Sequence, residues 1–491
     1  MLRWLVPLVL GGASATGFAP LNWWFMTLLC FAGLIALIER APSLWSAIRT
    51  GWWFGLGHFT IGLNWIATAF YFQDAMPHWL GWIAVVLLSL YLAVYPAAAV
   101  GLAWRWGQPS LIPLTLIFAA AWIVTEWLRA TMFTGFAWNP VGVTLVEIGT
   151  VSRWIGTYGV SAIVLLGAGA VAGFGVGKWR QGAVLALPIL GTALISMLVS
   201  APPPDKPALL RVVQPNINQN EKYSEELLFS NIRRLTRLTG WATGTPRLVL
   251  WPEAAIPYAL EDDTEARHAF AGLLGPGDIL LTGGDALVRN RSGDLIAARN
   301  SLFALDVKAR ILARYDKSHL VPYGEYLPMR PILSAIGISR LVPGDMDFLP
   351  GPGPQSYVLP GFGRVGVQIC YEIIFSGQVV DRNHRPDFLF NPSNDAWFGA
   401  WGPPQHLAQA RMRAIEEGLP IIRSTPTGIS AVVDANGTVR RHVPWQKAGA
   451  ITARLPAPLP PTLFSKWGNL LPLLFAALLT AISIAVRRRA R

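Results

Sequence analysis

Residues 363–374 read GRVGVQICYEII, a short apolar run with repeated valines that ends at Cys370. A run of this length and composition, bounded by turn residues, predicts a buried β-strand. Similar runs recur along the second half of the chain together with two helical stretches, and this pattern predicts an α/β fold. The predicted strands are LLRVVQ, RLVLW, DILLTG, SLFAL, ARYDK, GRVGVQI, DFLFNPS, PIIRST and SAVVD, and the predicted helices are Ser224 to Thr239 and His406 to Glu417.

Two other predicted strands also end in reactive side chains. Glu253 follows the strand in RLVLWPEAAIP, and Lys317 and then Glu325 follow the strand in ARYDKSHLVPYGEY, just as Cys370 follows the strand in GRVGVQICYEII. Strand ends hold side chains rigidly, which a nucleophile, a base and an oxyanion stabiliser all require. The sequence therefore indicates a Glu, Lys and Cys site built from three strand ends.

Each of these residues also has a purely structural interpretation. A buried cysteine usually behaves as a small apolar residue, Glu253 could be an acid in the first turn of a helix, and Lys317 could be a solvated surface lysine. Taken singly, the structural interpretations are favoured. Taken together and in this order, the three residues favour catalysis, because only a cysteine with a nearby base and cation attacks well at neutral pH.

The composition indicates a membrane protein. Of 491 residues, 53% are hydrophobic and only 14% are charged, whereas a soluble domain carries roughly 25% charged residues. Residues 1–200 hold 8 of the 40 Lys and Arg and 4 of the 28 Asp and Glu, so this part is membrane-like and the rest is soluble-like. The apolar runs that approach the ~20 residues needed to cross a bilayer are Leu5 to Phe18, Trp23 to Ile38, Trp52 to Phe72, Leu80 to Trp104, Leu111 to Leu128, Tyr158 to Val176, Ala183 to Val199 and Leu470 to Val486.

The positive charges predict the orientation of these eight spans. Alternation from a cytoplasmic N-terminus places most Lys and Arg of residues 1–200, and the arginines at the C-terminus, on one side of the membrane. The positive-inside rule makes that side cytoplasmic. We therefore expect a multi-pass membrane protein whose segment between spans seven and eight lies outside the cytoplasm, in the periplasm if the cell is Gram-negative, and whose C-terminus lies in the cytoplasm. For residues 1–15, a cleaved signal peptide is the alternative.

The same features exclude several partners and cofactors. The net charge of +12 comes partly from the C-terminal arginines beside the last span, so we interpret it as an orientation signal and expect no nucleic acid. The two cysteines, Cys30 and Cys370, lie in such different contexts that no disulfide is expected, and no spacing of Cys and His indicates zinc. We expect no metal and no dissociable cofactor.

Four motifs carry a family resemblance. WPEAAIP, DKSHLVPYGEY, CYE and NPSNDAWF resemble the nitrilase superfamily of carbon–nitrogen hydrolases, in which a sandwich of two β-sheets between helices carries a Glu-Lys-Cys triad in this order. With the many spans before this part and one after it, the whole chain resembles the apolipoprotein N-acyltransferase family. We therefore expect a membrane domain of about seven spans over residues 1–200, a nitrilase-like α-β-β-α catalytic domain outside the cytoplasm over 208–456, a transmembrane helix over 466–487 and a basic tail over 488–491.

The resemblance implies roles for single residues. Cys370 is expected to be the nucleophile, Glu253 the general base and Lys317 the stabiliser of the tetrahedral oxyanion, with a backbone amide just after Cys370 completing the oxyanion hole. Glu325 and Glu372 are expected to support catalysis, Glu325 by holding Lys317 or assisting proton transfer. The expected substrate-binding residues are Tyr223, which stands where the family commonly has a tryptophan, and Tyr371, Asn394 and Trp397.

The resemblance also implies the reaction. An acyl chain passes from a phospholipid, typically phosphatidylethanolamine, to Cys370 as a thioester, and then to the α-amino group of the diacylglyceryl cysteine that begins an apolipoprotein. The expected partners are the phospholipid donor, the diacylated apolipoprotein acceptor and the lipid bilayer, and the expected state is a monomer. Ala335 to Pro354 is predicted to be a lid over the acyl pocket, with a plain surface connection as the alternative. Phe133 to Pro140 is predicted to be a lipid-facing loop, and an aromatic loop that anchors without recognising a lipid is the alternative.

Two other functions compete with this one. A membrane-anchored amidase could use the same triad to hydrolyse a small amide, with water as the acceptor. Eight spans exceed what anchoring requires, because a single transmembrane helix already inserts almost irreversibly. A transporter or a non-enzymatic scaffold is disfavoured because polar residues in the spans are few and because Glu253, Lys317 and Cys370 occur together.

Overall fold

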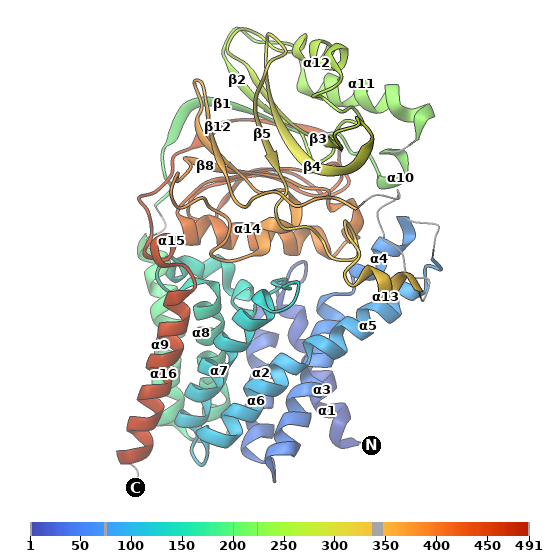
Figure 1. Ribbon diagram of the computed structural model, residues 1–491. Helices are drawn as coiled ribbons and strands as arrows, with labels where there is room; N and C mark the ends of the chain where they lie inside the picture. The colour runs from blue at the N-terminus through green and yellow to red at the C-terminus, as the bar shows by residue number, and fades with distance from the viewer. Residues whose placement is uncertain (1, 73–75, 200, 223, 336–346, 490–491) are drawn as a thin grey trace.

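The computed structural model describes residues 2–72, 76–199, 201–222, 224–335 and 347–489. Figure 1 shows a bundle of long helices below a sandwich of β-sheets, with both termini at the end of the bundle that faces away from the sheets. Tyr223 lies outside the described residues, as does most of the predicted lid.

The chain up to Val199 is almost entirely helical, and one long helix returns at the C-terminus. The helices of this bundle are α1 (Leu2–Ser14), α2 (Trp24–Glu39), α3 (Leu44–Gly62), α4 (Ile66–Ala69), α5 (Leu80–Leu92), α6 (Val94–Gly107), α7 (Leu111–Thr131), α8 (Ser152–Gly175), α9 (Trp179–Val199) and α16 (Leu470–Arg489), with the 3₁₀ turns η1 (Ala15–Gly17), η2 (Phe70–Phe72) and η3 (Val141–Val151).

Helical segments of the bundle are long and apolar enough to cross a membrane. Among the described residues, the five that qualify are Leu80–Gly107, Leu111–Thr131, Val141–Gly175, Trp179–Val199 and Leu470–Arg489, and the shorter apolar helices are Trp4–Gly17 and Trp24–Glu39. Large apolar side chains such as Leu187 and Leu190 on α9 and Leu474 on α16 point outward and are exposed. An apolar surface of this kind is unfavourable in water and favourable against lipid tails. The protein is therefore an integral membrane protein, while the number of eight spans stays a prediction.

The third predicted span, Trp52 to Phe72, is displaced in the structure. Its helix, α3, begins at Leu44, where the Ser43 side chain accepts a hydrogen bond of 3.2 Å from the Ser46 N–H, and it ends at Gly62. An N-cap serine fixes the start of a helix by satisfying a free N–H of the first turn. The apolar run was thus a poor guide to this boundary, because the helix starts at its cap and not at its first tryptophan.

The second part of the chain forms two six-stranded sheets. The first sheet has the order β12-β1-β2-β3-β4-β5 and the second has β11-β10-β9-β8-β7-β6. Three neighbouring strands at the centre of each sheet are parallel and the outer strands are antiparallel. The strands are β1 (Asp205–Gln214), β2 (Arg247–Leu250), β3 (Ile279–Arg289), β4 (Leu295–Asp306), β5 (Ile311–Asp316), β6 (Ser356–Leu359), β7 (Gly363–Val367), β8 (Phe388–Pro392), β9 (Ile421–Ser424), β10 (Ser430–Val433), β11 (Val439–Val443) and β12 (Gly449–Pro456).

Helices cover the outer faces of the two sheets, so the predicted α-β-β-α sandwich is confirmed. The first sheet carries α11 (Leu228–Thr239) and α12 (Thr264–Ala271) on its outer face, where they pack on a separate apolar cluster that includes Trp251 and Phe303. The second sheet carries α14 (Gly402–Glu417), which lies between that sheet and the bundle (Figure 1). The remaining helical segments are α10 (Gln219–Lys222), η4 (Glu225–Leu227), α13 (Arg330–Ala335), η5 (Cys370–Ile374), η6 (Asp395–Phe398) and α15 (Leu463–Trp467).

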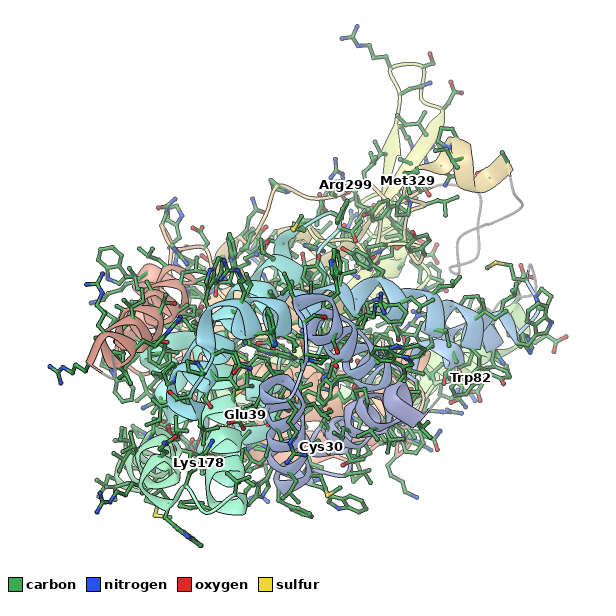
Figure 2. All side chains as sticks on the ribbon, turned by 90° about the horizontal axis from the view of Figure 1, so that it is seen from below. Cys30, Glu39, Trp82, Lys178, Arg299 and Met329 are labelled. Carbon is green, nitrogen blue, oxygen red and sulfur yellow. The ribbon has the colours of Figure 1, made fainter. Side chains whose placement is uncertain are left out.

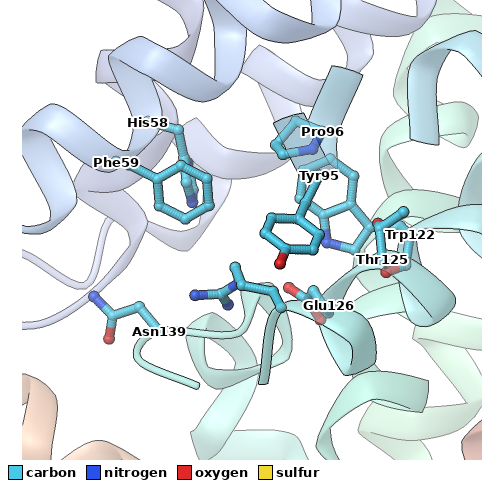
Figure 3. A pocket seen from close by; sticks show the side chains of 9 residues that line it. His58, Phe59, Tyr95, Pro96, Trp122, Thr125, Glu126 and Asn139 are labelled. Carbon is cyan, nitrogen blue, oxygen red and sulfur yellow. Dashed lines mark hydrogen bonds between the residues drawn. The ribbon is translucent and has the colours of Figure 1, made fainter. Parts of the chain in front are cut away.

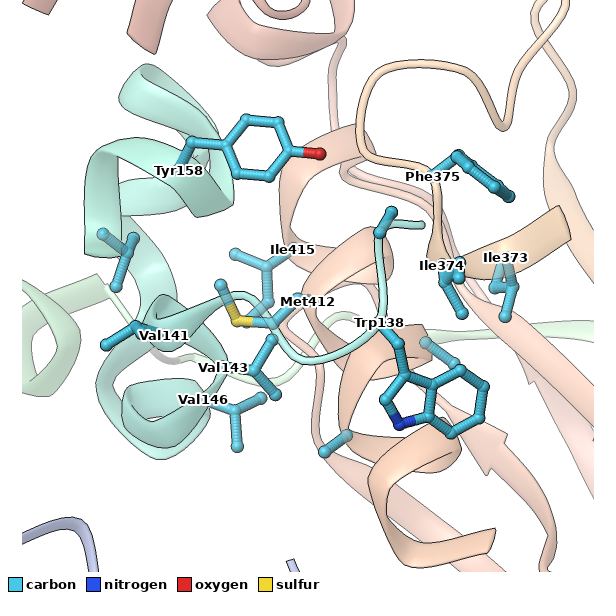
Figure 4. Close-up of a cluster of buried hydrophobic side chains, with 14 of the residues drawn as sticks. Trp138, Val141, Val143, Val146, Tyr158, Ile373, Ile374, Phe375, Met412 and Ile415 are labelled. Carbon is cyan, nitrogen blue, oxygen red and sulfur yellow. The ribbon is translucent and has the colours of Figure 1, made fainter. Parts of the chain in front are cut away.

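The bundle and the sandwich share one continuous apolar core. Trp138 and Val141 from the bundle pack in the same cluster as Ile374, Met412 and Ile415 from the sandwich (Figure 4). Burial of this much apolar surface holds the two parts in one arrangement. The chain also enters and leaves the sandwich at one edge, because β1 and β12 pair with Asp205 opposite Pro456.

Candidate active site

The predicted triad residues all follow strands of the sandwich and are buried. Glu253 follows β2, Lys317 follows β5 directly, and Cys370 follows β7 at the start of η5. Their side chains are 6%, 1% and 4% exposed. The Glu253 loop packs tightly on β3, where a Cβ at Gly283 would lie 2.8 Å from the Glu253 Cα. Only glycine leaves room for this approach.

Lys317 lies between two carboxylates. Its Nζ donates to Glu325 Oε1 at 2.9 Å and contacts Glu253 Oε1 at 3.4 Å. Although burial opposes the charged form, Glu325 and then Glu253 raise the pKa of Lys317 above its ordinary value. The lysine is therefore a fixed cation at neutral pH, held in a site from which water is largely excluded.

Asn300 on β4 joins the two carboxylates. Its Nδ2 donates to Glu253 Oε1 at 2.7 Å and to Glu325 Oε1 at 2.9 Å. The Val321 N–H donates to Glu325 Oε2 at 2.8 Å. Glu325 is thus oriented from both sides, whereas Glu253 Oε2 is buried without a hydrogen-bond partner among the described residues. This oxygen is the one free to accept a proton.

Cys370 has a strained backbone and a thiol that strongly favours its protonated form. Its φ of 52° lies in the left-handed region, which costs a residue with a side chain roughly 1–3 kcal/mol. Burial, and then the charge of Glu253, raise the pKa of the Cys370 thiol well above its ordinary value, while Lys317 and the backbone N–H of Asn394 oppose the shift. Cys370 therefore needs a base to become a nucleophile.

Glu372 braces the loop that carries Cys370 against the loop that carries Lys317. Its carboxylate accepts hydrogen bonds from the backbone N–H groups of Ser318, His319 and Ile369 and from the hydroxyls of Ser318 and Tyr315. These donors lie at 2.6–3.1 Å. Glu372 therefore joins these two loops, and its support of catalysis stays a prediction.

The other predicted substrate-binding residues among the described ones, Tyr371, Asn394 and Trp397, make different contacts. Tyr371 donates from its hydroxyl to the Gly135 carbonyl of the bundle at 3.3 Å. Asn394 donates to Gln219 Oε1 at 2.8 Å. Trp397 is only partly buried and packs edge-on against Phe72, with 5.6 Å between the ring centroids. These contacts place Tyr371 and Trp397 at the junction with the bundle.

The predicted lipid-facing loop from Phe133 to Pro140 is split between two environments. Phe133 is 84% exposed, but Trp138 is fully buried and donates from its indole to Gln405 Oε1 on α14 at 2.8 Å. Arg129 on α7 holds the loop by donating to the carbonyls of Phe136 at 3.0 Å and Trp138 at 2.8 Å. Only the tip of this loop is therefore available to lipid.

A small polar cavity lies inside the bundle next to this loop (Figure 3). It is lined by His58, Glu126, Arg129 and Asn139 with neighbouring aromatic residues. Glu126 Oε1 accepts from the Val141 N–H at 2.8 Å, so the carboxylate also secures the chain after the loop. Polar groups inside a membrane domain often mark a transport pathway, but here Arg129 and Glu126 hold backbone.

Cys30 and the charged end of the bundle lie away from the triad residues. Cys30 is buried in α2 within the bundle (Figure 2). Both Cys30 and Cys370 are free thiols. Lys178 donates to Glu39 Oε1 at 2.8 Å (Figure 2). Among the described residues no group of three or more His, Cys, Asp and Glu is arranged to hold a metal ion.

Sequence reasoning missed a network behind the cysteine. His406 on α14 lies 3.1 Å from the Cys370 carbonyl and 2.9 Å from Asp395 Oδ1, and Arg423 on β9 donates to Asp395 Oδ2 at 2.9 Å. Asn300 was missed as well. The partners of these residues lie in other segments of the chain, so the sequence carries little signal for them. Only Arg423, inside the apolar strand β9, stands out by its polarity, because α14 around His406 is itself rich in polar residues.

Comparisons with known proteins agree over nearly the whole chain. The family model for the apolipoprotein N-acyltransferase N-terminal domain matches residues 10–170, and the model for carbon-nitrogen hydrolases matches residues 209–459. An apolipoprotein N-acyltransferase of Rhodopseudomonas palustris is 33% identical over 514 residues, covering 99% of this chain and 95% of the relative. One of Bradyrhizobium diazoefficiens is 34% identical over 521 residues with the same coverage.

A similarity to solved structures is more distant. Nit3 of Saccharomyces cerevisiae, a member of branch 10 of the nitrilase superfamily, is 19% identical and has a TM-score of 0.36, covering 51% of this chain and 90% of that chain. The assignment of the sandwich rests on its two sheets and on the matching family model. Together they define an enzyme of the carbon–nitrogen hydrolase superfamily.

Within that superfamily the matches are specific. Both family models occur in one chain, in the same order as the bundle and the sandwich. The chain belongs to the apolipoprotein N-acyltransferase family, and it is an acyltransferase.

Proposed function

We propose that this enzyme transfers an acyl chain from phosphatidylethanolamine to Cys370 as a thioester, and from there to the α-amino group of the diacylglyceryl cysteine that begins a lipoprotein. The observation that carries the proposal is the position of the Lys317 ammonium, 2.9 Å from Glu325 and 3.4 Å from Glu253, in the buried site of Cys370. A fixed cation stabilises an oxyanion best where water is excluded.

In the first half-reaction, Glu253 takes the thiol proton and the Cys370 sulfur attacks an ester carbonyl of the phospholipid. Lys317 stabilises the oxyanion that develops on the carbonyl oxygen. When the intermediate collapses, the C–O bond breaks and the lysophospholipid alkoxide takes the proton from Glu253. The products are the thioester on Cys370 and a lysophospholipid, and no oxidant or metal is required.

In the second half-reaction, a neutral α-amine attacks the thioester carbonyl. Glu253 accepts a proton from the attacking nitrogen, the C–S bond breaks, and the proton returns to the sulfur of Cys370. An α-amine has a pKa of about 7.7–8.0 against about 10.4 for lysine, so its neutral fraction is roughly a few hundred times larger at equal pH. This difference selects an N-terminus over lysine side chains.

The junction with the membrane favours transfer over hydrolysis. The residues after Cys370 pack on the bundle. Tyr371 donates a hydrogen bond to the Gly135 carbonyl, and Ile374 lies in the apolar core that the bundle and the sandwich share. Donor and acceptor both carry acyl chains, so the bilayer confines them near this junction and gives effective concentrations on the order of mM. Water is kept from the thioester by the burial of Cys370.

The same proposal includes the topology. All eight predicted spans, including α1–α3, cross the inner membrane, the catalytic domain over 208–456 lies in the periplasm, and the basic tail at 488–491 lies in the cytoplasm. The excess of Lys and Arg on one side supports this orientation. Single cysteines in a Cys30→Ala, Cys370→Ala background, placed in the loops and labelled in intact cells, should react only on the periplasmic side of each span.

The proposed unit of function is the monomer, because the three triad residues and their partners come from one chain. A reconstituted acyl transfer assay tests the proposal as a whole. Purified protein is mixed with phosphatidylethanolamine and a peptide that begins with diacylglyceryl cysteine, and the mass of the peptide is measured by mass spectrometry.

The peptide should gain one acyl chain with wild-type protein and none with Cys370→Ala. The same peptide with an acetylated N-terminus should gain nothing, even when it contains lysine. Hydrolysis of a small amide by wild-type protein, with no acyl chain on the peptide, would instead identify an amidase.

A further inference from the structure

The backbone carbonyl of Cys370 is held by the network around His406, which the sequence analysis did not identify. His406 Nε2 lies 3.1 Å from the Cys370 oxygen, and Asn391 Nδ2 donates to the same oxygen at 3.4 Å. A carbonyl oxygen can only accept, and so can the Asp395 carboxylate oxygen that faces Nδ1, so the ring makes both hydrogen bonds with a proton on each nitrogen. Two side chains thus fix the peptide bond between Cys370 and Tyr371.

Arg423 organises both of these donors. It donates to Asp395 Oδ2 at 2.9 Å, and Asp395 Oδ1 faces His406 Nδ1 at 2.9 Å, which fixes the ring. It also donates to the Asn391 side-chain oxygen. All four side chains are at most 1% exposed. Buried charged groups are retained when they are fully paired and hold a geometry.

Aromatic side chains pack against the His406 ring on top of its hydrogen bonds. Trp138 from the bundle loop lies 5.3 Å from the ring and Phe398 lies 5.7 Å from it, centroid to centroid. The Nε2 position therefore has little freedom to move. Among the described residues, the hydrogen bonds of this network to Cys370 go to its backbone carbonyl, on the side of the peptide opposite to the N–H. The charge of Asp395 also acts on the thiol, where it adds to burial and to Glu253 in raising the pKa of Cys370.

This geometry has a consequence for oxyanion stabilisation. The carbonyl of Cys370 and the N–H of Tyr371 belong to one planar unit and point in opposite directions. Holding the carbonyl therefore aims the N–H, and a hydrogen bond to the carbonyl polarises the unit and strengthens the N–H as a donor. The φ of 52° at Cys370 requires such restraint, because the strained conformation persists only where its surroundings impose it.

We propose that His406 is a positioning residue of acyl transfer: by donating from Nε2 to the Cys370 carbonyl, it aims the Tyr371 N–H at the oxyanion of both half-reactions. The inference rests on the thioester chemistry proposed above. His406 does not touch the substrate, and its contribution lies in the donor at Nε2.

Two variants at position 406 separate the effect of the hydrogen-bond donor from the effect of side-chain volume. His406→Gln keeps an N–H donor near the position of Nε2, and His406→Met has almost the same shape as the Gln variant but no donor. The matched control is Gln409→Met, one turn further along α14, where the side chain accepts from the Asn139 N–H and does not contact Cys370. The three variants and wild type are purified as full chains, and their folding is checked by thermal unfolding.

Two rates are measured on each protein. The first is the gain of a hydroxylamine-labile acyl chain from phosphatidylethanolamine in a single turnover. The second is alkylation of Cys370 by iodoacetamide, which needs the thiolate but no oxyanion hole. Removal of a direct oxyanion donor lowers rates about 10²- to 10³-fold, so loss of a residue that aims one should lower acylation by about 10-fold or more.

We expect His406→Met to acylate about 10-fold or more slowly than wild type with alkylation within about 3-fold, and His406→Gln and Gln409→Met to stay within about 3-fold in both rates. Equal acylation by the Gln and Met variants, or alkylation that falls as far as acylation, would overturn the proposal. If His406→Met does not fold, a 10-fold loss in folded His406→Gln overturns it. A wild-type protein without a labile adduct would count against the thioester itself.

Discussion

Glu325 lies closer to the Lys317 ammonium than Glu253 does, at 2.9 Å against 3.4 Å. The lysine is therefore held mainly by a residue from the loop that follows β5, and Glu253 keeps one oxygen without a partner among the described residues. The two carboxylates thus have different tasks. We propose that Glu325 fixes the cation and that Glu253 is the base.

Replacement of Glu325 by Gln should slow formation of the acyl-enzyme by about 10- to 100-fold. The amide keeps an oxygen near Nζ but removes the charge that holds Lys317 protonated. Single-turnover acylation measures this effect. Glu261→Gln, which removes an exposed carboxylate paired with Arg314, is the control and should acylate like wild type. Equal rates in the two variants would contradict the role of Glu325.

Replacement of Asn300 by Leu should lower both stability and activity. Two buried carboxylates lose the same donor, and a hydrogen bond to a charged group contributes roughly 1.5–3 kcal/mol. The melting temperature should fall by several degrees and acylation should fall with it. A variant that melts like wild type and acylates normally would show that Lys317 alone organises the two carboxylates.

Glu372→Gln should destabilise the protein more than Glu325→Gln does. In wild type, both carboxylate oxygens of Glu372 accept hydrogen bonds from backbone N–H groups. A glutamine replaces one of these oxygens by an NH₂ group, so at least one buried backbone N–H loses its acceptor. Such a loss costs about 1–3 kcal/mol per group. Thermal unfolding of the two variants compares them directly. If Glu372→Gln keeps its melting temperature but loses activity, Glu372 acts on the reaction and does not merely brace the loops.

The buried carboxyl of Glu417 at the end of α14 should make stability depend on pH. Burial, and then the charge of Glu416, raise the pKa of Glu417 from 4.5 to about 7. Because the folded-state value is the higher one, its contribution to stability is fully present below pH 4.5 and is lost as the pH rises through about 7.

Glu417→Gln should therefore be more stable than wild type at pH 8, by a few degrees in melting temperature, and should lose this advantage at pH 4.5. Glu265→Gln on the exposed surface of α12 is the control and should differ from wild type equally at both pH values. A pH-independent difference for Glu417→Gln would show that the pKa of Glu417 is the same in the folded and the unfolded protein.

The central strands could be predicted from the sequence because each is an apolar run. The strands that were not predicted, β6, β11 and β12, all lie at sheet edges. β11 reads VRRHV, and its polar residues suit a strand that is half exposed. β12 becomes a strand by pairing with β1, more than two hundred residues earlier. Edge strands of this kind are fixed by their partners and carry little local signal.

The candidate site divides in the same way. Glu253, Lys317 and Cys370 could be predicted because they follow strands within recognisable motifs. Asn300 and His406 could not, because Asn300 meets its partners across neighbouring strands and His406 reaches Cys370 from a helix behind the second sheet. Both depend on tertiary contacts that no spacing in the sequence encodes. The catalytic roles of Glu253, Lys317 and Cys370 and the positioning role of His406 stay predictions.

The intact mass of the purified protein after incubation with phosphatidylethanolamine alone tests the central claim most directly. The account predicts a gain of one fatty acyl chain that hydroxylamine removes, present in wild type and absent in Cys370→Ala. The same gain in Cys370→Ala, or no gain in folded wild-type protein that has bound the lipid and releases no fatty acid, would contradict a thioester on Cys370.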